Sequence, residues 1–170
     1  MSKIPLKVMI VEDSNDDAEL LVHALDRAGY KSTTPLVQSA EKMKSLLGKQ
    51  TWDLITSDYV IPGFGGLAAL EVLRENDLDI PFIIVSGKIG EDVAVEALKA
   101  GANDYLLKDR LTRLGAAVDR ALKEAAQKKK RRIAEAALHE SEDRYRRLVE
   151  SCPDAMFILT DGIFSFANRA

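Results

Sequence analysis

Hydrophobic and polar positions along the first part of the chain predict a repeated strand–helix unit. Short runs of bulky apolar residues, typical of buried parallel strands, are separated by stretches with apolar residues at helical spacing. Five strands are expected, at residues 6–11, 35–38, 53–58, 81–86 and 104–108. This alternation predicts an α/β fold, in which a doubly wound parallel sheet has helices on both faces and right-handed crossovers.

Capping residues mark the ends of the helices between these strands. An acidic turn at residues 12–17 can cap the first helix, and Ser39 can cap the second. Glycines close three of the helices, at Gly29, near Gly48 and at Gly101. After the loop behind residue 58, a third helix is expected from Leu67, and a fourth over about 91–100. A long helical pattern begins at about residue 109.

Polar side chains stand at the carboxyl ends of four predicted strands. Glu12 and Asp13 follow the first, Asp58 ends the third, Ser86 ends the fourth and Lys108 ends the fifth. In open α/β sheets the ligand site lies at the carboxyl ends of the strands. The pattern therefore predicts that these five side chains meet at one edge of the sheet.

This set of side chains is suited to phosphoryl transfer. Three carboxylates that meet at one edge tolerate their mutual repulsion when a divalent cation lies among them, and hard oxygen ligands suit Mg²⁺. The ammonium of Lys108 and the hydroxyl of Ser86 can stabilise phosphoryl oxygens. Asp58 is the candidate nucleophile, and it needs no histidine base because a carboxylate is already ionised at neutral pH.

Composition narrows the class of protein. Apolar residues make up 46% of the 170 residues, enough for a core, and the net charge of −3 gives no general case for a nucleic-acid surface. The single cysteine, Cys152, fits a reducing compartment and excludes both an intramolecular disulfide and a thiolate metal site. No signal peptide or membrane-length apolar run is found. We therefore expect a cytoplasmic chain without a membrane segment.

With these residues in order, the sequence resembles the response-regulator receiver family of two-component signalling. The resemblance extends from about residue 6 to residue 127 and rests on several motifs at the family's spacing. These are the acidic pair Glu12-Asp13, the phosphoacceptor-like Asp58 with Pro62 four residues on, Ser86, the aromatic Tyr105, and Lys108.

The resemblance implies a flavodoxin-like strand order, 2-1-3-4-5, and a magnesium-dependent phosphoacceptor. Mg²⁺ would be held by Asp13, Asp58 and the backbone carbonyl of Val60, with Glu12 helping. The phosphoryl group would pass to Asp58 from the phosphohistidine of a histidine kinase or a histidine phosphotransfer protein.

The resemblance also implies a switch. Ser86 would move toward the phosphate and Tyr105 would rotate inward, which would alter the surface formed by helix 91–100, strand 104–108 and the helix after it. Two departures bear on this expectation. Asp109 replaces the proline that usually follows the lysine. Val60 and Lys88 stand at positions that influence how fast the phosphate is lost in this family.

Residues 111–150 predict one long helix, because the stretch is rich in Ala, Glu, Lys, Arg and Leu and has no proline. It carries two heptad-like stripes that are out of phase by one residue and are separated by the basic run 128–132. The first stripe is Leu111, Leu114, Val118, Ala121 and Ala125, and the second is Leu138, Ser141, Tyr145, Leu148 and Cys152. A solvated helix, packed on the first domain at its start, is one interpretation. A parallel dimer helix that transmits a signal is the favoured one, since so long a helix is hard to sustain alone. The face altered by the switch is a second candidate dimer surface.

Pro153 breaks the helix, and two strands are expected over 154–160 and 163–167 with a turn at 161–162. Residues 141–170 resemble the opening of a PAS sensor domain. The expected organisation is a receiver at 1–127, a helical linker at 128–150 and the truncated start of a PAS domain at 151–170. The chain would then be a piece of a larger receiver–PAS protein.

The favoured function is a self-phosphorylating switch, not a turnover enzyme. Two alternatives remain open. A phosphorylation-independent interaction module could use the same fold and a helical dimer surface. A phosphotransferase or phosphatase could act on small molecules through an aspartyl-phosphate, but it would need a substrate-binding insertion, and the predicted loops are short.

Overall fold

The computed structural model describes residues 3–76, 78–87, 90–151, 153–154, 157–160 and 163–167. Several predicted features lie outside the described residues: Lys88, Cys152, the turn at 161–162 and the last three residues of the stretch predicted to open a PAS domain. The chain divides into two compact units, 1–126 and 127–170, and each is described by itself.

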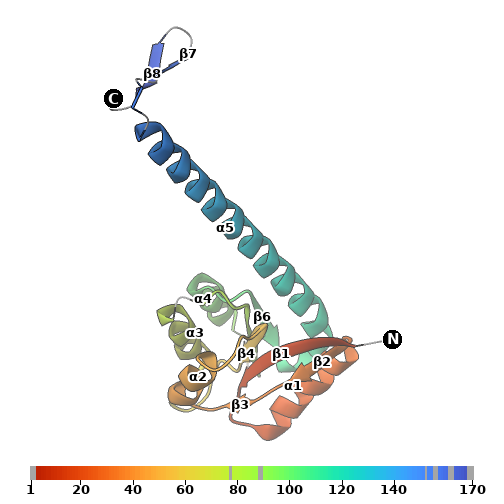
Figure 1. Ribbon diagram of the computed structural model, residues 1–170. Helices are drawn as coiled ribbons and strands as arrows, with labels where there is room; N and C mark the ends of the chain where they lie inside the picture. The colour runs from red at the N-terminus through yellow and green to blue at the C-terminus, as the bar shows by residue number, and fades with distance from the viewer. Residues whose placement is uncertain are drawn as a thin grey trace. The chain divides into compact units, whose positions relative to one another are not determined.

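The first unit alternates strands and helices around one parallel sheet (Figure 1). Its strands run in the order β2-β1-β4-β5-β6, which is the predicted order with one extra strand counted. The strands are β1 (Ile4–Val11), β2 (Tyr30–Thr33), β3 (Leu36–Val37), β4 (Leu54–Ser57), β5 (Phe82–Ser86) and β6 (Asp104–Leu107). The helices are α1 (Asn15–Arg27), α2 (Ala40–Leu47), α3 (Gly66–Glu75), α4 (Glu91–Ala100), the 3₁₀ helix η1 (Lys108–Arg113) and α5 (Leu114–Glu150).

The edge strand differs from its prediction. A single strand was expected at 35–38, but the sheet edge consists of β2 and β3, and both pair with β1. Ile4 pairs with Tyr30 and Ile10 with Leu36, so the register is the same on both sides of Pro35. Proline has no N–H to give to the ladder, which accounts for the break. The pattern of β2 was missed because an edge strand has one neighbour and tolerates polar residues.

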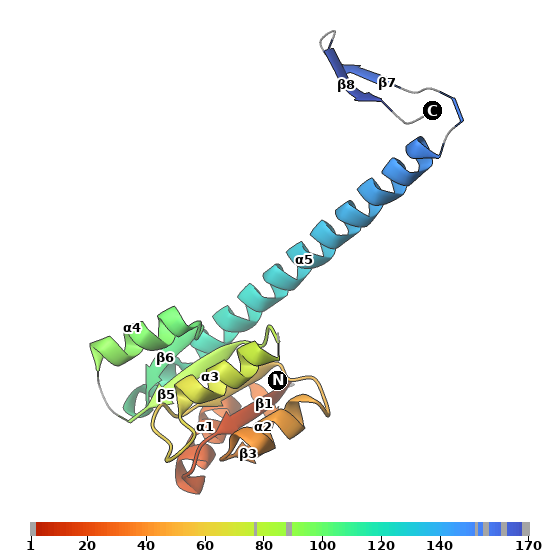
Figure 2. The ribbon, with the colours of Figure 1, turned by 90° about the vertical axis from the view of Figure 1, so that its left-hand side faces the viewer.

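Helices cover both faces of the sheet (Figures 1 and 2). Helices α2, α3 and α4 lie on one face, over a core that includes Ile55 and Ile84. Helix α1 and the start of α5 lie on the other face, over a core that includes Leu54 and Ile83. Because neighbouring residues of a strand point to opposite faces, every residue of β4 and β5 is buried, and most of them are apolar, as the apolar runs predicted.

The start of α5 belongs to the first unit. Leu114, Val118 and Ala121 are buried in the core beneath α1, so the first of the two predicted stripes packs on the sheet. The hydroxyl of Tyr30, on β2, donates a hydrogen bond to Asp119 of α5. Burial and this carboxylate raise the pKa of Tyr30 to about 12. The tyrosine therefore stays neutral and joins the edge strand to the helix.

The second unit contains the rest of α5 and two strands, β7 (Phe157–Thr160) and β8 (Ile163–Ala167), which pair antiparallel. Two strands were predicted in this stretch, and both are present, although the first begins at Phe157 and residues 155–156 of its predicted span lie outside the described residues. Of the second predicted stripe on α5, Leu138, Tyr145 and Leu148 are each more than 60% exposed.

Among the described residues, no helix combines the length and the apolar character needed to cross a bilayer.

Thr56, in the middle of β4, gives a first testable prediction. It is fully buried, it lies between Ile10 and Ile83 on the neighbouring strands, and its hydroxyl has no hydrogen-bond partner among the described residues. Thr56→Val removes this unpaired group and keeps the shape of the side chain. We expect the free energy of unfolding to rise by about 1 kcal/mol, measured by urea denaturation.

Thr51→Val, at an exposed position before β4, is the matched control and should change stability little. A Thr56→Val variant that is less stable than the wild type would show that the hydroxyl is satisfied in solution.

Candidate functional site

The sheet places the candidate residues at the carboxyl ends of β1, β4, β5 and β6. The backbone hydrogen bonds of the sheet continue for one residue beyond the ends of β4 and β1. The backbone N–H of Asp58 donates to the Val11 carbonyl at 2.9 Å, and that of Glu12 donates to the Val37 carbonyl at 3.0 Å. These bonds fix the backbone at both carboxylates, so their side chains start from a rigid edge.

The loop behind Asp58 is folded tightly against the backbone of the same segment. The Gly66 N–H donates to the Tyr59 carbonyl at 3.1 Å. A Cβ atom at Gly65 would lie 2.5 Å from the carbonyl oxygen of Tyr59, which is closer than any side chain allows. Glycine is therefore needed for the loop to turn back and start α3 directly behind the carboxylate.

Lys108 is the centre of the site. Its Nζ atom lies 2.6 Å from Oδ2 of Asp58, 2.6 Å from Oδ2 of Asp17 and 2.8 Å from Oε2 of Glu12. Lys108 was predicted to end a strand, but the strand stops at Leu107 and the lysine begins η1. One ammonium thus donates to three carboxylates that come from different elements.

Burial and hydrogen bonding together determine the pKa values of Glu12 and Lys108. The side chain of Glu12 is 1% exposed. Burial raises the pKa of the Glu12 carboxyl above its ordinary value, although hydrogen bonds from Lys108 and the Ser14 backbone oppose the rise. Burial alone would lower the pKa of Lys108, but its hydrogen bonds to Asp17, Asp58 and Glu12 outweigh this and raise the pKa. The lysine is therefore firmly cationic.

Asp58 is held on both sides. Its Oδ1 atom accepts a hydrogen bond from the Val60 N–H at 3.2 Å, while its Oδ2 atom accepts from Lys108. The side chain is 11% exposed, so a small reactant can still reach the carboxylate. Such an oriented, partly accessible carboxylate is suited to nucleophilic attack on a phosphoryl group.

The other predicted residues lie around this centre. Asp13 is exposed, and its oxygens are not among the carboxylate oxygens that gather at the site. Ser86 is buried at the end of β5, where its register partner Leu107 directly precedes Lys108. Tyr105 is half-buried on β6, and its ring lines a groove between α4 and η1. The side chain of Val60 is 58% exposed.

Asp17 is the residue that sequence reasoning missed. It was assigned to the cap of the first helix, together with its neighbours. The cap is Ser14, whose hydroxyl accepts from the Asp17 N–H at 3.3 Å, and this leaves the Asp17 carboxylate available for Lys108. The signal that could have found it is its place in the first turn of the helix that follows the acidic pair, which starts beside the same sheet edge.

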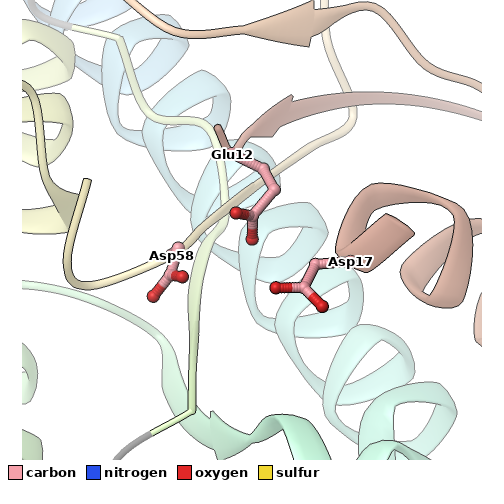
Figure 3. Close-up of side chains that lie close together, drawn as sticks. All are labelled: Glu12, Asp17 and Asp58. Atoms are coloured by element: carbon pink, nitrogen blue, oxygen red, sulfur yellow. The ribbon is translucent and has the colours of Figure 1, made fainter. Parts of the chain in front are cut away.

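Three carboxylates gather at the site, where the side chains of Glu12, Asp17 and Asp58 lie close together (Figure 3). Oxygens of Glu12, Asp17 and Asp58 all lie within 4.8 Å of one another. Hard anionic oxygens at this spacing are the donors that Mg²⁺ prefers, so the residues present fit a divalent cation.

Comparison with known proteins is consistent with this geometry. Residues 8–119 match the family described as response regulator receiver domain. The chain is 30% identical over 103 residues to the phosphate regulon transcriptional regulatory protein PhoB of Pseudomonas aeruginosa, covering 59% of this chain and 44% of that protein. It is 35% identical over 114 residues to the DNA-binding transcriptional regulator NtrC of Klebsiella pneumoniae, covering 66% of this chain and 24% of that protein. The chain thus spans less than half the length of these relatives.

Among solved structures, the chain is also similar to receiver domains. The signal receiver domain of a signal transduction histidine kinase from Syntrophus aciditrophicus is 32% identical, with a TM-score of 0.59 over 70% of this chain and 91% of that one. The receiver domain of a Francisella response regulator is 25% identical, with a TM-score of 0.61 over 70% of this chain and 98% of that one.

Proposed function

Since the chain belongs to the response regulator receiver family, we propose that it is a phosphoacceptor switch and that Asp58 takes the phosphoryl group. The donor is the phosphohistidine of a histidine kinase or of a histidine phosphotransfer protein. The observation that carries this proposal is the placement of the Asp58 carboxylate between the Val60 N–H and the Lys108 ammonium, at the open edge of the sheet.

The chemistry is one displacement at phosphorus. A carboxylate oxygen of Asp58 attacks the phosphorus, a P–O bond forms and the P–N bond to the donor imidazole breaks. The imidazole takes a proton from water as it leaves. Lys108 stabilises the charge on the transferred oxygens, and the hydroxyl of Ser86, the last residue of β5, would donate to one of them.

A divalent cation completes the charge balance of the site. Glu12, Asp17 and Asp58 would hold it with their carboxylates, and the sequence resemblance adds Asp13 and the Val60 carbonyl. Bound there, Mg²⁺ supplies the positive charge that draws a phosphodonor into an otherwise anionic edge. The chain's own residues orient the acceptor and keep one ammonium beside it.

The consequence of phosphorylation reaches the surface between α4 and β6. We propose that Ser86 and Tyr105 respond to the phosphoryl group as the switch pair. Two contacts support this. Tyr105 lines the groove between α4 and η1 together with Arg110 and Arg113. The hydroxyl of Tyr59, the residue after the acceptor, donates to Glu96 of α4 at 3.1 Å. The hydrogen bond from Tyr59 connects the acceptor segment to α4, and Tyr105 lies in the same neighbourhood of α4.

The test of the phosphoacceptor proposal is phosphoryl uptake by wild type and Asp58→Asn from acetyl phosphate and Mg²⁺, read by intact mass. Incorporation by the wild type alone supports Asp58 as the acceptor.

The output is relayed through α5, and we propose that two copies of the chain pair along its second half. Leu138, Tyr145 and Leu148 recur at heptad-like spacing, and all three are exposed. A helix that stays in solvent as a single copy has no need for apolar residues at this spacing. The relay would lead into the PAS-like stretch that contains β7 and β8. The dimer is the interpretation of this apolar stripe that leaves the fewest apolar side chains in water.

The dimer can be tested by sedimentation equilibrium. Replacing both leucines of the stripe, Leu138→Glu with Leu148→Glu, is expected to weaken self-association more than about tenfold, because each leucine contributes about 1.5–3 kcal/mol on burial. Ala136→Glu, on the far side of the helix, is the matched control. A wild-type chain that stays monomeric at high concentration would rule out pairing along α5.

A further inference from the structure

The first turn of α1 carries a side chain that no receiver motif named above includes. We propose that Asp17 is a positioning residue, which holds the Lys108 ammonium beside Asp58 both before and after the phosphoryl group arrives. This inference rests on the proposed phosphoacceptor function and adds a residue to its machinery.

The contact between Asp17 and Lys108 is as close as the one to the acceptor. Nζ lies 2.6 Å from Oδ2 of Asp17 and 2.6 Å from Oδ2 of Asp58. Asp17 is 34% exposed, yet its carboxylate points into the cluster (Figure 3). Glu12 and Asp58 both follow strands of the sheet, whereas Asp17 is the member that comes from a helix.

The local structure keeps the carboxylate of Asp17 in place. Its own N–H is bonded to the Ser14 hydroxyl, so the backbone at this position is fixed by the helix cap. Because Ser14 performs the capping, the Asp17 side chain is not needed for the helix terminus. A short side chain on a fixed backbone holds an ammonium in place better than a side chain on a mobile backbone does.

The physical need for such an anchor follows from the chemistry at Asp58. Lys108 has a long, flexible stem, and its position is set by the acceptors of its ammonium group. Once an oxygen of Asp58 is bonded to phosphorus, that carboxylate loses its full negative charge and becomes a weaker acceptor. Glu12 and Asp17 then remain to hold Nζ against the phosphoryl oxygens. Without Asp17, one buried carboxylate is left to do so.

Asp16 provides a matched control. It lies in the same first turn of α1, carries the same charge and is exposed. Asp16→Asn and Asp17→Asn therefore change the net charge and the charge at the helix terminus equally. Because Asp17 is also one of the carboxylates that would hold Mg²⁺, a difference between the two variants that is seen without Mg²⁺ reports the contact with Lys108.

Two measurements test the inference. In the first, phosphoryl uptake from acetyl phosphate with Mg²⁺ is followed over time by intact mass. We expect Asp17→Asn to take up the group about three to ten times more slowly than the wild type, and Asp16→Asn to differ less than about twofold. In the second, NMR of the lysine ammonium groups without Mg²⁺ and without a phosphodonor should show faster hydrogen exchange at Lys108 in Asp17→Asn alone.

The outcomes separate this inference from the proposed function. Equal uptake rates and equal Lys108 exchange in the Asp16 and Asp17 variants would overturn the inference and leave the phosphoacceptor proposal intact. A wild type that takes up no phosphoryl group would overturn the proposed function and, with it, the positioning role after transfer. Faster exchange at Lys108 in Asp17→Asn, together with slower uptake, supports the inference as stated.

Discussion

Asp58→Asn is expected to abolish phosphoryl uptake completely. An amide is not a nucleophile toward phosphorus. Among the residues that the structure describes, no other carboxylate combines a hydrogen bond from the Val60 N–H with one from Lys108. The substitution keeps the size of the side chain, and its amide oxygen can still accept from the Val60 N–H. After incubation with acetyl phosphate and Mg²⁺, intact mass should show one base-labile, acid-stable phosphoryl group on the wild type and none on the variant.

Asp92→Asn, at an exposed position of α4, is the control and should be phosphorylated like the wild type. Phosphorylation of Asp58→Asn would identify another residue as the acceptor. If the wild type stays unmodified while it binds Mg²⁺, the phosphorylation-independent interaction module becomes the better interpretation. Continuous turnover of a small phosphate ester would instead favour the phosphotransferase or phosphatase.

Lys108→Met is expected to slow phosphoryl uptake by about 10²-fold, because it removes the ammonium that is held against the acceptor. Methionine keeps much of the volume of the lysine stem, so the change is mainly one of charge. The rate is measured as the time course of phosphoryl incorporation at a fixed concentration of acetyl phosphate. Lys99→Met, exposed in the last turn of α4, is the matched loss of one positive charge and should leave the rate unchanged.

The same variant should lose stability. Without Lys108, the buried carboxylate of Glu12 and that of Asp58 lose the cation that compensates them. We expect the free energy of unfolding to fall by about 1–3 kcal/mol in urea denaturation without Mg²⁺. Added Mg²⁺ should restore part of this loss, since it replaces the missing positive charge. A Lys108→Met variant as stable as Lys99→Met would show that the cluster is balanced without the lysine.

Much of the fold was predictable from the sequence because the central strands are buried on both faces. The apolar runs around Ile55 and Ile84 left no alternative to a covered parallel sheet, and Ser39 and Gly101 marked helix ends that the structure has. The edge strand β2 was not predictable in the same way, because a strand with one neighbour needs no apolar run. One strand was predicted at 35–38, but in the structure Pro35 lies between the two short edge strands, β2 and β3.

The sequence by itself determined which strand ends carry chemistry. Glu12, Asp58 and Lys108 were predicted to meet because each follows an apolar run, and parallel strands bring their carboxyl ends to one edge. Only the tertiary structure decided how the lysine's charge is shared. The docking of α1 against the sheet brings Asp17 to Lys108, whereas Asp13, adjacent to Glu12 in sequence, is left exposed. The place of Asp17 in the first turn of α1 makes it a candidate from the sequence. Whether its carboxylate reaches the ammonium depends on how the helix packs, and that is decided by the tertiary structure.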